Sequence, residues 1–188
     1  MPIWNASLYL GMGLKQTIQS INQIVDEYEL LLNRVSEEEF KQTPAEGVWS
    51  YSEVFSHIFR SNLLSFKAIE RCSRSEGVED HERTKLKYRL VLFFRSFPPN
   101  VRWKVPAKLA HLVEKISKEE ARQLINDFRA GLKAVEPDIR NASPYQKVKH
   151  PRMELLNAEQ WLIFTQIHTG HHAKQLKRIK KMFDAVNQ

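Results

Sequence analysis

The sequence predicts an all-α protein built as a four-helix bundle, and three observations lead to this prediction. The 188 residues include only 6 glycines and 8 prolines, too few for the many turns of a β-sandwich or barrel. Apolar residues recur at steps of three and four along the long segments, as on one face of a helix. Polar capping patterns precede three of the four predicted helices. The length suits one domain, which we place at residues 1–188.

Composition and charge narrow the class of protein further. The single cysteine excludes an intramolecular disulfide and a cysteine-rich zinc site. The longest apolar run, Leu90–Phe94, is far shorter than the roughly 20 residues of a membrane span. The chain does not open with the charged segment of a signal peptide. We therefore expect a cytoplasmic protein without a membrane partner. The formal net charge of +7 at most favours an anionic small ligand.

The first predicted helix covers residues 14–34, where the apolar residues follow the helical period. Residues 1–13 are apolar, and we expect them to form an ordered lead-in that packs on the domain. After the helix, Ser36 and Glu39 form a capping box that opens a short extra turn. The pair Thr43-Pro44 ends this turn, because the residue before a proline avoids the α region.

The second predicted helix begins sharply after Ser50. Ser50 can cap the helix, and Glu53 lies three residues on, where its carboxylate can reach back. The helix runs to about Arg74. A long connection over residues 75–116 follows and holds a further helical segment at 82–95. A connection of this length in a compact domain is often functional.

The third predicted helix starts at another capping box, formed by Ser117 and Glu120. It runs to about Val135, and Pro137 closes it. Residues 138–156 are basic and contain prolines. We expect them to form a loop that leads to the last helix.

The last predicted helix covers residues 158–185 and carries a pair of histidines. Asn157 caps it, with Gln160 three residues later. His168 and His172 are four residues apart and therefore share one face of this helix. This is the spacing with which two imidazoles chelate one metal ion. The pair lies on the apolar stripe of the helix, which faces the core.

A third histidine, His57, lies on the inner face of the second helix. If the two helices are neighbours, His57, His168 and His172 converge and can bind a zinc- or nickel-type ion with one coordination position left open. The alternative is that each is a hydrogen-bonded core residue. His171 points about 100° away from its neighbours, so it lies outside this ligand set or exchanges roles with His172. Gly170 would allow a close approach of a neighbouring helix.

Two motifs at these histidines resemble the DinB-like superfamily, which includes thiol-dependent transferases. The segment Trp49–His57 is similar to the family's W-S-x-x-E-(x)₃-H helix start, and His168–Leu176 is similar to its H-x-x-H-H-x-x-Q-L final helix. The resemblance implies an up-down-down-up bundle, a homodimer, and a divalent ion bound by His57, His168 and His172. In family members of known activity, the metal activates a low-molecular-weight thiol that attacks an electrophile.

The first functional hypothesis is therefore a metal-dependent S-transferase that activates a small thiol for attack on a small-molecule substrate. A hydrolase that activates water is its close variant. Other reactive residues have simpler interpretations: Glu53 is a helix cap, and Cys72 is a small core residue. Arg60, Arg102 and Lys104 could hold an acidic substrate or the carboxylate of a thiol, although the sequence does not place them at the site.

The second hypothesis is a non-enzymatic binding or stress-related module with a basic surface and a structural or vestigial metal site. Nucleic acid is disfavoured as a partner, because aromatic residues do not alternate with the basic ones and no helix-turn-helix or RNA-binding motif is found. Basic residues near a helix C-terminus also complement its dipole. The residues of this candidate basic patch are Lys174, Lys177, Arg178, Lys180 and Lys181, with Lys147, Lys149, His150 and Arg152.

Overall fold

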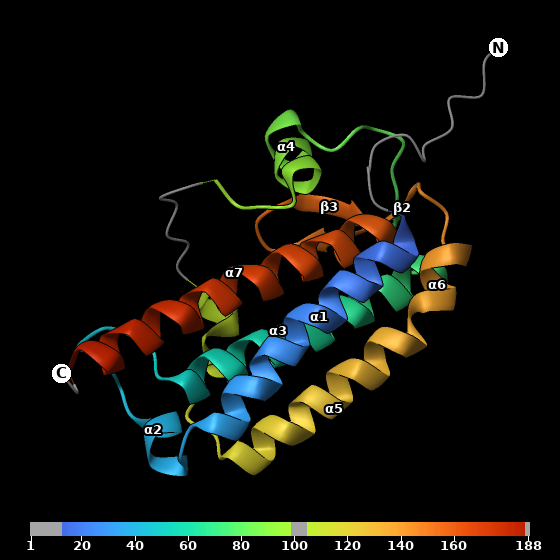
Figure 1. Ribbon diagram of the computed structural model, residues 1–188. Coiled ribbons are helices and arrows are strands. Elements are labelled where there is room, and N and C mark those ends of the chain that lie inside the picture. Colours follow the sequence, from blue (N-terminus) through green and yellow to red (C-terminus); the bar gives the residue numbers. More distant parts are fainter. Residues whose placement is uncertain (1–12, 99–104, 187–188) are drawn as a thin grey trace.

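The computed structural model describes residues 13–98 and 105–186, and four long helices dominate it (Figure 1). The predicted lead-in lies outside the described residues except for Gly13. None of the helices in the described ranges combines the length and the apolar character that crossing a membrane requires. The long helices are α1 (Leu14–Arg34), α3 (Tyr51–Ser73), α5 (Lys118–Ala134) and α7 (Ala158–Val186).

The four helices form the predicted bundle. α1 and α7 run in one direction and α3 and α5 in the other, which is the expected up-down-down-up order (Figure 1). α3 packs against both α5 and α7, and α1 packs against α7. Aromatic rings interlock at the centre: Tyr28 meets Phe55 and Phe59 edge-to-face at 5.2 and 5.3 Å between ring centroids. Such edge-to-face pairs add to the stability gained by burial alone.

Polar caps fix the helix starts within a residue of their predicted positions. At α3, Ser50 Oγ accepts a hydrogen bond from the Glu53 N–H at 3.3 Å, and Glu53 Oε2 accepts one from the Ser50 N–H at 2.8 Å. α5 begins with the same reciprocal pair. The short helix α2 (Glu37–Lys41) is capped by Ser36. At α7, Asn157 Oδ1 accepts from the N–H of the residue three positions later at 2.9 Å.

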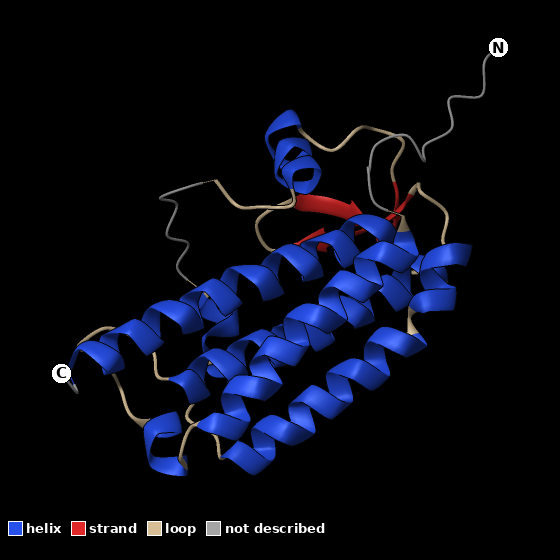
Figure 2. Ribbon diagram, in the orientation of Figure 1, coloured by secondary structure: helices blue, strands red, loops and turns tan. Residues whose placement is uncertain are grey.

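The prediction of a loop over residues 138–156 is wrong. Pro137 lies in the first turn of a further short helix, where the missing N–H costs nothing. A β-hairpin follows, and its first strand also pairs with a strand from the connection after α3, so that a small antiparallel sheet forms beside the bundle (Figure 2). These elements are α6 (Glu136–Asn141), β1 (Val78–Glu79), β2 (Gln146–His150) and β3 (Glu154–Asn157).

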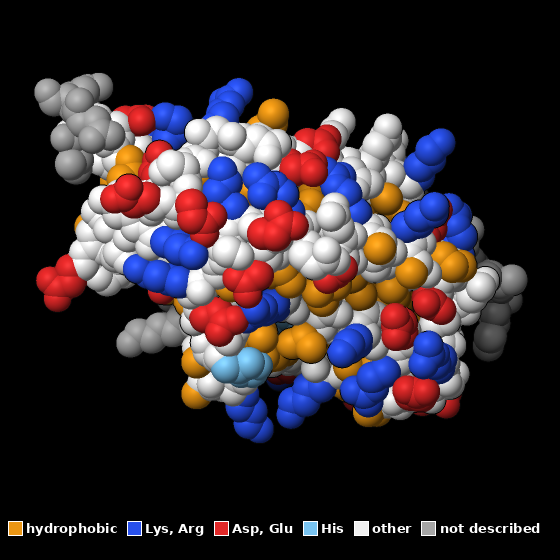
Figure 3. Space-filling model, turned by 90° about the horizontal axis from the view of Figure 1, so that it is seen from below, with side chains coloured by type: hydrophobic (Ala, Val, Ile, Leu, Met, Phe, Trp, Pro, Cys, Tyr) orange, Lys and Arg blue, Asp and Glu red, His pale blue; other side chains and the backbone are white. Residues whose placement is uncertain are grey.

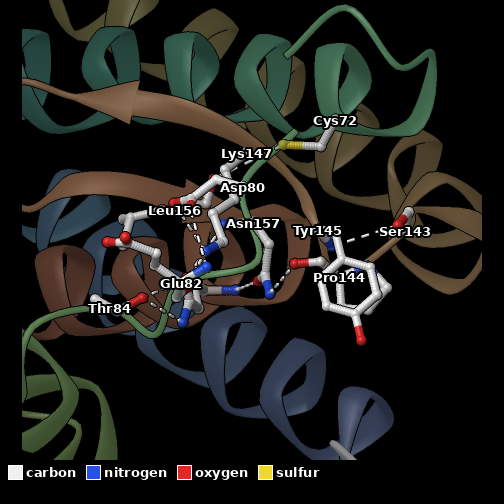
Figure 4. Close-up of polar contacts among 11 residues, drawn as sticks. Cys72, Asp80, Glu82, Thr84, Ser143, Pro144, Tyr145, Lys147, Leu156 and Asn157 are labelled. Atoms are coloured by element: carbon white, nitrogen blue, oxygen red, sulfur yellow. Dashed lines mark hydrogen bonds and ion pairs between the residues drawn. The ribbon is translucent and has the colours of Figure 1, made fainter. Parts of the chain in front are cut away.

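A buried lysine holds this sheet together (Figure 4). Lys147 is only 5% exposed, and its Nζ donates to Asp80 Oδ2 at 3.1 Å and to the Glu82 carbonyl at 2.5 Å. The Glu82 N–H in turn donates to Asp80 Oδ1 at 2.9 Å. The prediction that placed Lys147 in an exposed basic patch is therefore wrong: its charge is used to tie β2 to the segment after β1.

The connection between α3 and α5 crosses the bundle. Because these two helices run in the same direction, the chain must return along the whole bundle before α5 can start. It carries α4 (Leu86–Phe94) and the 3-10 helix η2 (Ala107–Leu112), and α4 packs on α7. The helical segment predicted at 82–95 corresponds to α4, which begins four residues later than expected. This crossing places the connection beside the histidines of α7.

Candidate metal centre

The structure brings the three predicted histidines together between α3 and α7. The centroid of the His57 ring lies 5.3 Å from that of the His168 ring and 4.9 Å from that of the His172 ring. The centroids of the two α7 rings are 4.8 Å apart. One ligand nitrogen from each residue lies within 4.8 Å of the others. The helical spacing of the α7 pair and the packing of α3 on α7 thus create one cluster of imidazoles.

A hydrogen-bond chain fixes the orientation of the His168 ring. The Thr169 hydroxyl donates to the Thr165 carbonyl at 2.7 Å, so its oxygen can only accept from Asn62 Nδ2, at 2.9 Å. The other end of this amide, Asn62 Oδ1, must then accept from His168 Nδ1 at 3.2 Å. His168 therefore carries its proton on Nδ1 and presents the lone pair of Nε2. Hydrogen bonds of this kind orient metal-ligating histidines.

His172 is held in a similar way. Its Nδ1 donates to Gln175 Oε1 at 2.7 Å, which leaves the Nε2 lone pair free. Trp49, from the segment before α3, covers both buried rings: it lies edge-on to His57 at 5.2 Å and stacks on His172 at 6.2 Å. The tryptophan of the motif thus shields the cluster from solvent.

Burial keeps the three rings neutral. It lowers the pKa of His57 to about 4 and that of His172 to about 3, with neighbouring histidines adding to the effect at His172. The pKa of His168 is lowered well below its usual value for the same reasons. Neutral imidazole is the form that binds a metal ion.

A divalent ion fits these residues. The His57 ring makes no hydrogen bond to any described residue, and its Nδ1 is fully enclosed. Leaving a buried polar atom without a partner costs about 1–3 kcal/mol, and a cation shared by the three rings gives His57 a partner that the protein does not supply. Three nitrogen ligands suit a divalent transition-metal ion and leave a coordination position open.

The cluster forms part of the wall of a cavity of about 190 Å³. Elements far apart in the sequence enclose this cavity: α3, α7, the crossing connection and the β-hairpin. No aspartate or glutamate is among the described residues that line it. Its apolar wall is formed by Trp49, Leu64, Phe97, Val105, Pro106, Leu109, Pro151, Trp161 and Phe164.

The other reactive residues predicted from the sequence lie elsewhere. Glu53 is the cap of α3, and Cys72 is a buried thiol whose pKa burial raises to about 11. Both predictions are confirmed. Arg60 forms an ion pair with Glu114. Arg102 and Lys104 lie outside the described ranges, so their proposed role stays a prediction.

The candidate basic patch is not a continuous positive surface. On α7, Lys177 pairs with Glu27 of α1 at 2.7 Å, and Lys180 pairs with Asp184 at 2.7 Å. His150 is 6% exposed and lies against α7. The face drawn in Figure 3, seen from below, carries both basic and acidic side chains over most of its surface.

Sequence reasoning missed two residues beside the histidines. Asn62 lies five residues after His57 on α3, and no sequence pattern distinguishes it from a surface asparagine. His150 was assigned to the basic patch, but it lines the cavity from the hairpin. His171 also lines the cavity, packed against Phe97 at 5.2 Å, and it is outside the cluster of three ligand nitrogens.

Comparisons with known proteins agree with the resemblance seen in the sequence motifs. A family model described as the DinB superfamily matches residues 21–176. The chain is 22% identical over 153 residues to the protein YuaE of Bacillus subtilis (strain 168), and the match covers 81% of this chain and 90% of YuaE.

Two solved structures have a similar fold. TT2238, described as a four-helix bundle protein, gives a TM-score of 0.56 at 17% identity, over 87% of this chain and 98% of TT2238. YfiT from Bacillus subtilis is described as a probable metal-dependent hydrolase with an unusual four-helix bundle topology. It gives a TM-score of 0.53 at 12% identity, over 93% of this chain and 91% of YfiT.

Proposed function

Because the chain belongs to the DinB superfamily, we propose that it is a metal-dependent enzyme with one divalent ion held by His57, His168 and His172. The observation that carries this proposal is the convergence of three neutral imidazoles, with ligand nitrogens within 4.8 Å of one another, on the wall of a cavity. The description of YfiT as metal-dependent supports it. Zinc and nickel are the ions that we expect.

A divalent ion at such a site lowers the pKa of a water molecule or thiol and so provides a nucleophile near neutral pH. The described cavity wall offers no carboxylate that could do this instead. We propose that the nucleophile is a low-molecular-weight thiol and that the reaction is S-transfer, with hydrolysis by water as the variant. The resemblance to thiol-dependent family members supports the thiol, and the description of YfiT supports water.

The protein's own residues orient and shield the site. Asn62 and Gln175 hold two of the rings in the tautomer that presents Nε2. Trp49 covers the cluster, and the apolar residues Leu64 and Leu109 give the cavity a wall that excludes water from an apolar substrate. These roles require a fixed geometry, which the packing of α3 on α7 provides.

Metal analysis of the purified protein tests the proposal. We expect about one zinc or nickel ion per chain, lost in both His57→Ala and His168→Ala, because two imidazoles bind these ions far more weakly than three. His111→Ala is the matched control, since His111 is exposed and lies on η2. Full metal content in the two site variants would refute the proposed ligand set.

A second measurement separates the two reactions. Metal-loaded protein is mixed with an electrophile, with and without cysteine as the thiol. Loss of free thiol that depends on the protein and its metal supports S-transfer, whereas turnover at an equal rate without cysteine supports hydrolysis.

We also propose that the protein acts as a cytoplasmic homodimer, as the family resemblance implies. Light scattering of the purified protein tests the oligomeric state. A mass of one chain across the concentration range would contradict the dimer and leave the metal site unaffected.

A further inference from the structure

His150 forms a part of the cavity wall that the proposed metal chemistry does not use. It ends strand β2 and is 6% exposed. Its ring packs against Phe164 and Trp161 of α7, at 4.2 and 4.9 Å between centroids, and Phe164 in turn stacks on His168 at 5.2 Å. His150 is thus one aromatic ring away from the histidine cluster.

The hairpin turn determines which nitrogen of His150 carries the proton. Its Nδ1 accepts hydrogen bonds from the backbone N–H groups of Arg152 and Met153, at 3.1 and 3.0 Å. A ring nitrogen that accepts cannot carry the proton, so the neutral ring has it on Nε2. Burial lowers the pKa of His150 to about 3, which keeps the ring neutral at physiological pH.

The Nε2–H group is therefore a fixed donor. It has no hydrogen-bond partner among the residues that the structure describes, and it lies across the ring from the turn that holds Nδ1. A donor in a largely apolar cavity gains most from an acceptor oxygen brought by a ligand, because an unmet hydrogen bond is costly where water is scarce.

We infer that the cavity binds a small, mostly apolar carbonyl compound whose oxygen accepts a hydrogen bond from His150 Nε2–H. This inference rests on the proposed function, for which it names the substrate class. The apolar residues Leu64, Pro106 and Leu109 face the body of the ligand. The volume of about 190 Å³ exceeds the roughly 150 Å³ of a cavity that takes up benzene, which leaves room for one ring and a carbonyl group.

Two probes of the same shape test this assignment. Acetophenone carries a carbonyl group, and α-methylstyrene has a C=CH₂ group in its place. Binding of both to the purified full-length protein is followed by NMR titration in wild type and in His150→Asn. Asparagine keeps an acceptor for the N–H groups of the turn, as in an Asx-turn, and its amide N–H groups end one bond short of the Nε2 position, so no donor remains there.

We expect the ratio of the two affinities to shift by about fivefold against acetophenone in His150→Asn, the equivalent of one ordinary hydrogen bond. Using the ratio cancels the change in cavity volume, which affects both probes alike. An unchanged ratio in a folded variant would overturn the inference.

A measurement on wild type keeps the test independent of the variant. The ¹⁵N chemical shifts of the His150 ring report which nitrogen is protonated, and a proton on Nδ1 would also overturn the inference. Metal content separates this result from the proposed function, since His150→Asn should keep its ion whereas His57→Ala should lose it.

Discussion

Hydrogen bonds to single side chains decide which nitrogen His168 and His172 present to the metal centre. His168 receives its orientation from Asn62, whose amide is fixed by Thr169 on the same helix as His168. The site therefore depends on residues outside the three-histidine ligand set. This dependence can be measured one residue at a time.

Asn62→Ala should weaken the binding of zinc or nickel by about 10- to 100-fold, because the His168 ring loses the acceptor that fixes its tautomer. Competition with a chromophoric chelator measures the affinity. The control is Asn33→Ala on the exposed face of α1, which should leave the affinity unchanged. Equal affinities in both variants would show that Asn62 does not orient the ring.

Two buried tyrosines should respond in opposite directions to the loss of their hydroxyl group. The Tyr28 hydroxyl donates to the Thr169 carbonyl at 2.8 Å, whereas the enclosed Tyr51 hydroxyl has no partner among the described residues. We expect Tyr28→Phe to lose about 1 kcal/mol of unfolding free energy and Tyr51→Phe to gain a similar amount. Urea unfolding measures both, and a loss in Tyr51→Phe would contradict this account.

The sequence predicts the three clustered histidines but not their neighbours, for a physical reason. His168 and His172 are related by local helix geometry, which a sequence displays directly. Asn62 and His150 gain their roles from contacts with residues 107 and 14 positions away, such as Thr169 and Phe164. Such contacts exist only once the helices and the hairpin have packed.

Among the secondary-structure elements, the helix starts follow from local sequence patterns, whereas the β-hairpin does not. The capping boxes at Ser50 and Ser117 are local, and both helices begin where their caps predict. The hairpin over 146–157 was missed because its buried face is not a simple alternation of apolar residues. Lys147 occupies a buried position, where the ion pair with Asp80 and a hydrogen bond to the Glu82 carbonyl satisfy its charge.

The two glycines inside α5 and α7 have different surroundings, which predicts opposite effects of alanine. The sequence suggests a close helix contact at Gly170, but a Cβ there would lie 3.7 Å from Ile24, an ordinary contact. At Gly131 a Cβ would lie 2.8 Å from the buried Phe66 ring. Gly170→Ala should therefore gain about 1 kcal/mol of unfolding free energy, and Gly131→Ala should lose about 1–3 kcal/mol.

Equilibrium unfolding in urea measures both glycine variants under the same conditions. A destabilised Gly170→Ala would show that α7 needs glycine for a reason other than the space around its Cα atom. A stabilised Gly131→Ala would show that Phe66 can move aside.

For the molecule as a whole, the parallel α3 and α5 determine the architecture of the site. Their connection must cross the bundle, and it supplies Phe97, Pro106 and Leu109 to the cavity. The sheet anchors the start of this connection through Asp80 and Lys147. The integrity of the cavity is thus linked to an ion pair at the edge of the bundle.

This link predicts an acid-sensitive stability. Hydrogen bonds from the Glu82 N–H and from Lys147 lower the pKa of Asp80 below its usual value. The contribution of Asp80 to stability is therefore complete above about pH 4, the usual carboxyl pKa, and it is lost as the pH falls through the lower value of the folded state. Asp80→Asn should lose roughly 3 kcal/mol at pH 7, because it leaves the Lys147 charge buried without its counter-ion.

Thermal unfolding of wild type and Asp80→Asn between pH 7 and pH 2 checks this prediction. The difference between their midpoints should shrink as the pH falls below about 4. The matched control is Asp184→Asn, which removes an exposed pair with Lys180 and should change the midpoint little. A difference that stays constant with pH would rule out Asp80 as the titrating group.

The histidines that meet in the cavity come from positions 111 residues apart in the chain. The ion that we propose to be shared by His57 and the pair on α7 would therefore act as a removable cross-link that only the folded chain can form. Each tenfold excess of free ion above its dissociation constant adds about 1.4 kcal/mol to the folded state. Starvation for one trace element would then reduce the lifetime of the molecules as well as the number that are active.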